Sequence, residues 1–202
     1  MKITGVILAG GRGQRLGGID KGLAPYGGRP LIEWVIARIQ PQVDVLVINA
    51  NRNGERYAAY GVPVIADVLG EFPGPLAGLH AGLVHTSHDW VLTIPCDTPS
   101  LPTDLVGRMQ AVMSGGNLEV VVAAHPQAWE PTVALYRSTL RPALEDFLAR
   151  DQRRVSDWIQ SRAYAVVRFD SARPFENLNR PEDFEGGQGG LLPQPTLPPH
   201  DR

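Results

Sequence analysis

The sequence predicts a three-layer α/β/α fold built on a doubly wound, mostly parallel sheet. Three short runs are almost continuously apolar and rich in β-branched residues, which is typical of strands covered on both faces. Segments with apolar residues at helical spacing separate these runs. The runs are residues 3–9, 43–49 and 90–95, and the helical segments are residues 30–40, 76–84 and 102–113. Strands and helices that alternate in this way form open sheets, which bind ligands beyond the carboxyl ends of the strands.

The second half of the chain is less regular but continues the same domain. We expect strands at residues 120–124, 132–136 and 163–169, helices at 140–149 and 155–161, and a turn at 125–131. Residues 186–202 contain four glycines and four prolines and few apolar side chains that could offset the entropy of ordering. The sequence therefore predicts a single domain over residues 1–185 and a disordered Gly/Pro-rich tail over residues 186–202.

Composition and charge exclude several classes of function. The 202 residues carry a formal net charge of −2, with 43% hydrophobic and 20% charged residues. Because there is no broad basic field, neither nucleic acid nor a membrane surface is an expected partner, and an anionic ligand has to be held by a local arrangement of groups. Cys96 is the single cysteine, so no internal disulfide can form and a cytoplasmic location is expected.

Phosphate binding is expected in the segment that follows the first strand. Residues 8–21 have the sequence LAGGRGQRLGGIDK, with five glycines and the cations Arg12, Arg15 and Lys21. Glycine allows positive φ and close approach of the backbone, so successive amides can converge on a polyphosphate. The cations add charge to these amide dipoles. A mobile surface loop with solvated charges is the alternative, but a position directly after a buried strand favours a ligand site.

Two common phosphate-binding loops do not fit this segment. The dinucleotide pattern G-x-G-x-x-G would need a third glycine where Leu16 stands, and the second strand ends in Asn49 instead of an acid. A P-loop that began at Gly13 would need lysine where Ile19 stands. A nucleoside triphosphate bound through a different loop geometry is therefore favoured.

At this loop the sequence resembles the nucleotidyltransferase superfamily, and most closely the molybdenum cofactor guanylyltransferases. The matching segments keep the family's order and spacing over residues 3–184. They are LAGG at 8–11, RLGG at 15–18, DKGL at 20–23, NANR at 49–52, PGPLAG at 73–78, PCDTP at 95–99, RRV at 153–155 and NLNRPE at 177–182. The residue before Lys21 is Asp20, whereas sugar-nucleotide enzymes typically have proline there. This difference narrows the resemblance to the guanylyltransferases.

The resemblance implies a Rossmann-like nucleotidyltransferase fold and a specific reaction. GMP would pass from GTP to the phosphate of molybdenum-molybdopterin, forming molybdopterin guanine dinucleotide and releasing pyrophosphate. The N-terminal half would bind the nucleotide and the C-terminal half the pterin acceptor. The family also implies Mg²⁺ as cofactor, with Mn²⁺ as an alternative, and transient contact with proteins that deliver molybdopterin or mature molybdoenzymes.

Several residues are candidates for the nucleotide half of the site. Asp97 follows an apolar strand, where a carboxylate either caps the next helix or binds Mg²⁺, and the resemblance assigns it to the metal. Lys21 and Arg15 are expected to contact phosphates as catalytic cations. Asn49 and Asp67 end strands at the ligand edge; they are either turn residues or contacts to the guanine nucleotide, as the resemblance implies. The nucleotide-binding set is Leu8, Ala9, Gly10, Gly11, Lys21, Asn49, Asp67 and Asp97.

Arg153, Arg154, Asn177 and Asn179 are the candidates for binding the acceptor. Arginine suits an anionic phosphate, and asparagine amides suit the donors and acceptors on the edge of a pterin. A solvated arginine pair and a turn before Pro181 are the structural alternatives.

Three other functions remain open from the sequence. A molybdopterin cytidylyltransferase would share the glycine-rich loop but not the contacts to the base. A sugar-nucleotide pyrophosphorylase is disfavoured by Asp20. A non-catalytic nucleotide-binding regulator would keep the loop without turnover, and Asp97 at the end of a strand argues against it.

Overall fold

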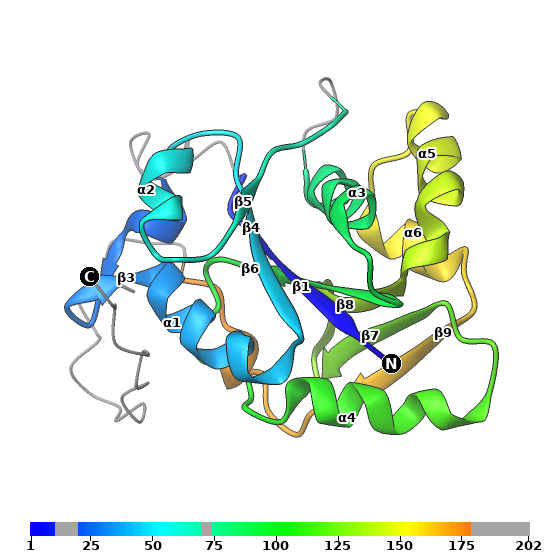
Figure 1. Ribbon diagram of the computed structural model, residues 1–202. Helices are drawn as coiled ribbons and strands as arrows, with labels where there is room; N and C mark the ends of the chain where they lie inside the picture. The colour runs from blue at the N-terminus through cyan, green and yellow to red at the C-terminus, as the bar shows by residue number, and fades with distance from the viewer. Residues whose placement is uncertain (11–19, 70–73, 179–202) are drawn as a thin grey trace.

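The computed structural model describes residues 1–10, 20–69 and 74–178, and within them it forms one mixed sheet of seven strands. The strand order is β5-β4-β1-β6-β8-β7-β9 (Figure 1). Only β8 runs antiparallel to its neighbours, so the prediction of a mostly parallel sheet is confirmed. The strands are β1 (Ile3–Leu8), β4 (Val45–Asn49), β5 (Val64–Ile65), β6 (Trp90–Pro95), β7 (Val120–His125), β8 (Ala128–Arg137) and β9 (Tyr164–Arg168).

Helices cover both faces of this sheet, and each face has its own apolar core. One layer contains α1 (Leu31–Ile39), α2 (Gly54–Ala58) and α4 (Leu105–Ala111), and the other contains α3 (Pro75–His85), α5 (Arg141–Ala149) and α6 (Val155–Gln160). Along β1, Ile3 and Ile7 pack in the first core and Val6 packs in the second. This alternation follows from the two-residue period of a strand, and it explains why the predicted strands are apolar at nearly every position.

Most predicted elements are present, with boundaries shifted by a few residues. The turn expected at 125–131 is present but shorter than predicted, because β7 continues to His125 and β8 already begins at Ala128. The pairing of β7 with β8 shifts between Val122 and Ala123, so Pro131 lies in an irregular stretch of the ladder where its missing N–H is tolerated. The helix expected from residue 102 begins only at Leu105.

Two small elements were missed by the sequence analysis. They are α2 and a hairpin of two-residue strands, β2 (Pro25–Tyr26) and β3 (Arg29–Pro30). Gly11, Arg15, Asn179 and the proposed tail at 186–202 lie outside the described residues. Among the described residues, no helix combines the length and the apolar character that crossing a bilayer would require.

Glycines in α3 let this helix lie directly on the parallel strands. A Cβ added at Gly78 would come within 2.5 Å of both the Asn49 side-chain oxygen and Leu8 Cδ2. A Cβ at Gly82 would come within 2.7 Å of Val6 Cγ2. Because real Cβ atoms do not approach other atoms this closely, the distance between α3 and β1 depends on these two glycines.

We expect Gly82→Ala to destabilise the protein by about 1–3 kcal/mol, because its methyl group would overpack the interface with Val6. Gly107 in α4 is the matched control, since a Cβ there meets nothing within 4 Å. Gly107→Ala should raise the free energy of unfolding by about 0.5–1 kcal/mol through helix propensity. Urea unfolding of both variants measures the difference. Equal effects would show that α3 can move away from the sheet without cost.

Candidate active site at the carboxyl edge of the sheet

The candidate site lies where the parallel strands end together. Leu8, the last residue of β1, is in register with Asn49 at the end of β4 and with Pro95 at the end of β6. The backbone keeps this alignment beyond the strands, because Ala9 N–H donates to the Asn49 carbonyl at 2.9 Å and Cys96 N–H donates to the Leu8 carbonyl at 3.3 Å. The polar residues that follow each strand are therefore held at one edge of the sheet.

Lys21 and Asp97 form an ion pair at this edge. Asp97 follows β6 by two residues, and Lys21 begins a short 3-10 helix, Lys21–Leu23. Lys21 Nζ donates to Asp97 Oδ2. The two side chains are 24% and 14% exposed, so the pair is partly shielded from water while a ligand can still reach it. The structure thus joins the two residues that the sequence assigned to phosphate and metal.

The second oxygen of Asp97 is poised for a cation ligand. Oδ1 is buried and has no hydrogen-bond partner among the described residues. A buried carboxylate oxygen without a donor costs free energy, and a hard cation that prefers oxygen ligands would satisfy it. Asp97 does not cap the next helix, because α4 begins eight residues later and its Val106 amide donates to Gln42 Oε1 at 3.0 Å. The capping alternative for Asp97 is therefore wrong.

A buried carboxylate beside Lys21 fixes the end of the glycine-rich segment. Asp20 is 6% exposed and accepts hydrogen bonds from the Tyr57 hydroxyl and, at 3.0 Å, from Asn53 Nδ2. Burial and the carboxylate together raise the pKa of Tyr57, so the hydroxyl stays protonated and remains a donor. Gly22 allows the contact, since a Cβ there would lie 2.6 Å from the Tyr57 oxygen. The sequence analysis missed this anchor, although Asp20 belongs to the DKGL motif.

Asn49 and Asp67 form a second polar cluster at the same edge. Asn49 is 3% exposed, and its Nδ2 donates to Asp67 Oδ1 at 2.9 Å. Asn51 donates from Nδ2 to Asp67 Oδ2 at 2.6 Å and accepts from the Asp67 amide at 2.8 Å. The Asp67 carboxylate is therefore oriented by two amides, and Gly10 lies beside both asparagines. Asn51 is a member of this cluster that the sequence analysis did not single out, although it stands in the NANR motif.

The predicted acceptor residues are only partly brought to this site. Leu178 N–H donates to the Asp97 carbonyl at 3.1 Å, which brings the neighbouring Asn177 close to the backbone of Asp97. Arg153 instead holds the end of α5, because its guanidinium donates to the Leu148 carbonyl at 2.7 Å and pairs with Asp151. Arg154 is the exposed residue that precedes α6. Arg153 therefore has a structural task at the end of α5 that the sequence did not reveal.

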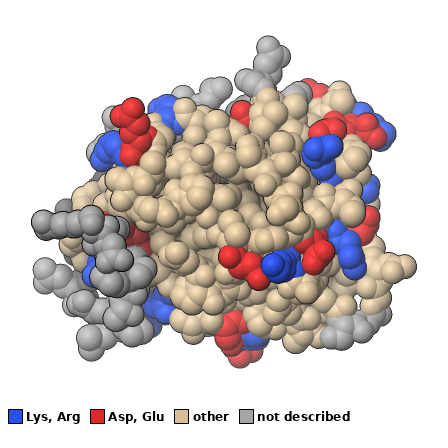
Figure 2. All heavy atoms as spheres, in the orientation of Figure 1, with Lys and Arg blue, Asp and Glu red and all other residues tan. Residues whose placement is uncertain are grey.

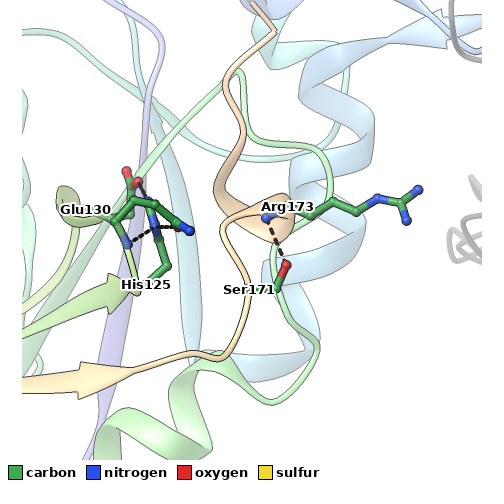
Figure 3. Close-up of polar contacts among 5 residues, drawn as sticks. His125, Glu130, Ser171 and Arg173 are labelled. Carbon is green, nitrogen blue, oxygen red and sulfur yellow. Dashed lines mark hydrogen bonds and ion pairs between the residues drawn. The ribbon is translucent and has the colours of Figure 1, made fainter.

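His125 and Glu130 are two further polar residues at this edge that the sequence analysis missed. β7 runs parallel to β9 and in the same direction as β6, so His125 ends its strand on the same side as Asp97. Figure 3 shows the side chains of His125 and Glu130 directed at one another, with Nε2 and Oε1 2.9 Å apart. A polar residue directly after the apolar run 120–124 was the available signal, the same one that marked Asn49 and Asp97.

The surface agrees with local capture of an anion. On the face seen in Figure 2, acidic and basic side chains lie in small mixed groups, at the margin and below the centre, and form no large patch of one sign. Lys21 is a cation that the site itself supplies.

Comparison with known proteins identifies the family. A model described as the MobA-like NTP transferase domain matches residues 5–166. This chain belongs to that family. As a MobA-like NTP transferase it is a nucleotidyltransferase, which agrees with the phosphate-binding role expected for the segment that follows β1.

Individual relatives extend the match along almost the whole chain. A molybdenum cofactor guanylyltransferase of Yersinia pestis is 48% identical over 189 residues, which are 91% of this chain and 93% of that protein. Among solved structures, molybdopterin-guanine dinucleotide biosynthesis protein A of Archaeoglobus fulgidus has a TM-score of 0.72 at 22% identity, covering 90% of this chain and 95% of that one. A Mycobacterium tuberculosis protein solved in complex with manganese has a TM-score of 0.67 at 17% identity, covering 95% and 100%. These structures share the fold of the MobA-like transferase.

We expect Tyr57→Phe to lower the free energy of unfolding by about 1–3 kcal/mol, because the buried Asp20 carboxylate would lose a donor. Tyr60→Phe is the matched control on the same segment. Tyr60 is only partly buried, so its change should stay within about 0.5 kcal/mol. Urea unfolding compares the two variants. If Tyr57→Phe were as mild as the control, Asp20 would not need this hydroxyl.

Proposed function

We propose that this protein transfers GMP from GTP to the phosphate of molybdenum-molybdopterin, forming molybdopterin guanine dinucleotide and releasing pyrophosphate. The observation that carries the proposal is the pairing of Lys21 with Asp97 at the carboxyl edge of the sheet, the same edge that holds the oriented Asp67 carboxylate. The identity of 48% with a molybdenum cofactor guanylyltransferase supports the choice of substrates.

This reaction requires electrostatics more than acid–base chemistry. A phosphate monoester has a second pKa near ~6 and is mostly dianionic at pH 7, so the acceptor needs no general base. The protein has to bring two anions together and offset the charge that develops on the departing pyrophosphate. Lys21 has three N–H donors, and its contact with Asp97 leaves it able to donate to phosphate oxygens as well.

We propose that Asp97 holds the catalytic divalent cation, Mg²⁺ or alternatively Mn²⁺. Its buried Oδ1 lacks a donor among the described residues, and its Oδ2 faces Lys21, so both its charge and its geometry fit a hard cation beside a phosphate. A bound divalent cation would stabilise the negative charge of the phosphates by several kcal/mol. One protein carboxylate is sufficient, because such ions usually complete their coordination with substrate oxygens and water.

We propose that Asp67 selects guanine, with Asn49 and Asn51 as its supports. Guanine presents adjacent N–H donors at N1 and N2, and a carboxylate can accept from both. Cytosine cannot present such a pair of donors. Since Asn49 and Asn51 each occupy one side of the Asp67 carboxylate, they fix its plane while lone pairs remain available on both oxygens.

The remaining alternatives differ in what they predict for nucleotides. A molybdopterin cytidylyltransferase would prefer CTP, and a sugar-nucleotide pyrophosphorylase would accept a sugar phosphate. A non-catalytic regulator would bind nucleotide without releasing pyrophosphate. Family resemblance further predicts binding of the acceptor by Arg153, Arg154, Asn177 and Asn179, transient contact with molybdopterin-delivering and molybdoenzyme-maturation proteins, and a cytoplasmic reaction.

In the presence of Mg²⁺, GTP should raise the melting temperature more than CTP, ATP or UTP, because only guanine offers the donors that Asp67 can accept together. Saturation at about 100 times the dissociation constant stabilises a protein by roughly 2.7 kcal/mol, which a thermal unfolding scan resolves. Asp67→Ala should reduce the preference for GTP but leave binding of inorganic triphosphate nearly unchanged. The largest shift with CTP would replace the guanylyl proposal with the cytidylyl one.

Asp97→Asn keeps the shape of the side chain but removes its charge, so we expect turnover to fall at least ~100-fold through loss of the cation. The affinity for GTP should also become less dependent on Mg²⁺. Asp104→Asn is the matched control, since Asp104 precedes α4 and asparagine serves equally well at that position. Pyrophosphate release measures both variants. Near-normal turnover of Asp97→Asn at limiting Mg²⁺ would remove Asp97 from the cation site.

A further inference from the structure

Glu130 belongs to the strand that neighbours β6, on the side of the sheet away from Asn49, and it lies toward the same edge as Asp97. The ladder between β6 and β8 ends at Thr93 and Ala134, and Asp97 and Glu130 each lie four residues beyond it in the same direction. Burial raises the pKa of the Glu130 carboxyl, the contact with His125 opposes this rise, and the charge of Asp97 adds to it. At 18% exposure the Glu130 side chain is partly shielded, as is Asp97 at 14%.

His125 holds Glu130 in place but leaves it able to bind a ligand. An ionised carboxylate only accepts hydrogen bonds, so His125 Nε2 is the donor to Glu130 Oε1 over 2.9 Å. The imidazole is itself fixed, since Nδ1 contacts the Gln127 side chain at 2.9 Å and the ring stacks on Phe175 with centroids 6.2 Å apart. In Figure 3 the Arg173 side chain points away from this pair. The second oxygen of Glu130 is therefore not engaged by His125 or by Arg173.

The same segment that stacks on His125 also closes against Asp97. Phe175 contacts the His125 ring, and three residues later Leu178 N–H donates to the Asp97 carbonyl at 3.1 Å. Three residues of extended chain span at most about 10 Å. His125, Glu130 and Asp97 therefore border one region, which Asn177 also adjoins.

The His125–Glu130 pair is not needed to hold its elements together. Backbone pairing already joins the two strands at Ala123 with Glu130 and at His125 with Ala128. The pair formed by His80 and Glu145 is different, because it links α3 to α5 across 2.9 Å and no strand pairing joins those helices. Partial burial of a carboxylate costs free energy. Because the hairpin does not need the His125–Glu130 pair for its support, this cost indicates that Glu130 binds a ligand.

We propose that Glu130, oriented by His125, binds the pterin ring of the acceptor by accepting hydrogen bonds from its ring N–H and its 2-amino group. This inference rests on the proposed function. A pterin carries these two donors side by side, and a carboxylate matches them with two acceptor oxygens. Because a carboxylate repels the acceptor phosphate and an ammonium group attracts it, the phosphate is directed away from Glu130 and toward Lys21. The His125–Glu130 pair thus sets the orientation of the bound acceptor as well as the affinity of the protein for it.

The test uses the full chain with Glu130→Gln, which keeps the size of the side chain and the contact with His125 but removes the charge. With molybdopterin and GTP as substrates, the KM for molybdopterin should rise about 10–100-fold, as expected for loss of charge-assisted hydrogen bonds. The dissociation constant for GTP should change less than about twofold. Glu145→Gln, at the other His–Glu pair, is the matched control and should change neither value.

Direct binding separates this inference from the proposed function. An oxidised pterin monophosphate, whose ring fluoresces, should bind the wild-type chain and bind Glu130→Gln about 10–100-fold more weakly. If the wild-type chain makes no product but this difference in binding holds, the proposed function fails and the role of Glu130 stands. If the wild-type chain makes product and Glu130→Gln leaves both the KM for molybdopterin and pterin binding unchanged, the inference is overturned alone. An equal loss of GTP affinity would also overturn it, since Glu130 would then act through the nucleotide.

Discussion

β1 lies between β4 and β6 and pairs in parallel with both, so the ends of three strands are held at one edge of the sheet. Two hydrogen bonds that continue this pairing also position polar residues. Ala9 bonds to Asn49, and Cys96, the residue before Asp97, bonds to Leu8. The glycines of α3 then allow the helix layer to approach β1 and Asn49 closely. If these strands did not end together at one edge, Lys21 and Asp97, which are 76 positions apart in the chain, would not meet.

The charges at this edge are arranged in two different environments. Asp20 is almost fully buried and already has two donors, so it serves the fold and fixes the backbone that presents Lys21. Asp97 is less buried, shares one oxygen with Lys21 and has a second oxygen without a donor among the described residues. A satisfied carboxylate contributes stability, whereas an incompletely satisfied one retains the ability to bind a ligand. Two aspartates close to Lys21 in space thus have separate tasks.

Asp97 also divides the edge into two sides. On one side, β4 and β5 present Asn49 and Asp67, where we place the base of the nucleotide. On the other, the hairpin of β7 and β8 and the segment that ends at Leu178 present polar groups that suit an acceptor. An in-line transfer between two phosphates needs its reactants on opposite sides of the charge-stabilising centre. The reversal of direction at β8 supplies the second side, because it adds a hairpin beyond the parallel strands.

Sequence alone predicted the layered α/β fold and the strands β1, β4 and β6, and it placed Asn49, Asp67 and Asp97 at the carboxyl ends of strands, because continuous apolar runs and the polar residues that follow them are local patterns. The short elements α2, β2 and β3 carry too few residues for a periodic pattern. Tertiary structure decided which polar residues meet. The amides on Asp67 and the position of Glu130 at the same edge as Asp97 depend on strand order, and the Asp20–Tyr57 contact joins residues 37 positions apart. The use of Arg153 at the end of α5 is a local contact, but an apolar pattern does not reveal it. Contacts between side chains far apart in the chain leave no local periodicity, so only the folded arrangement reveals them.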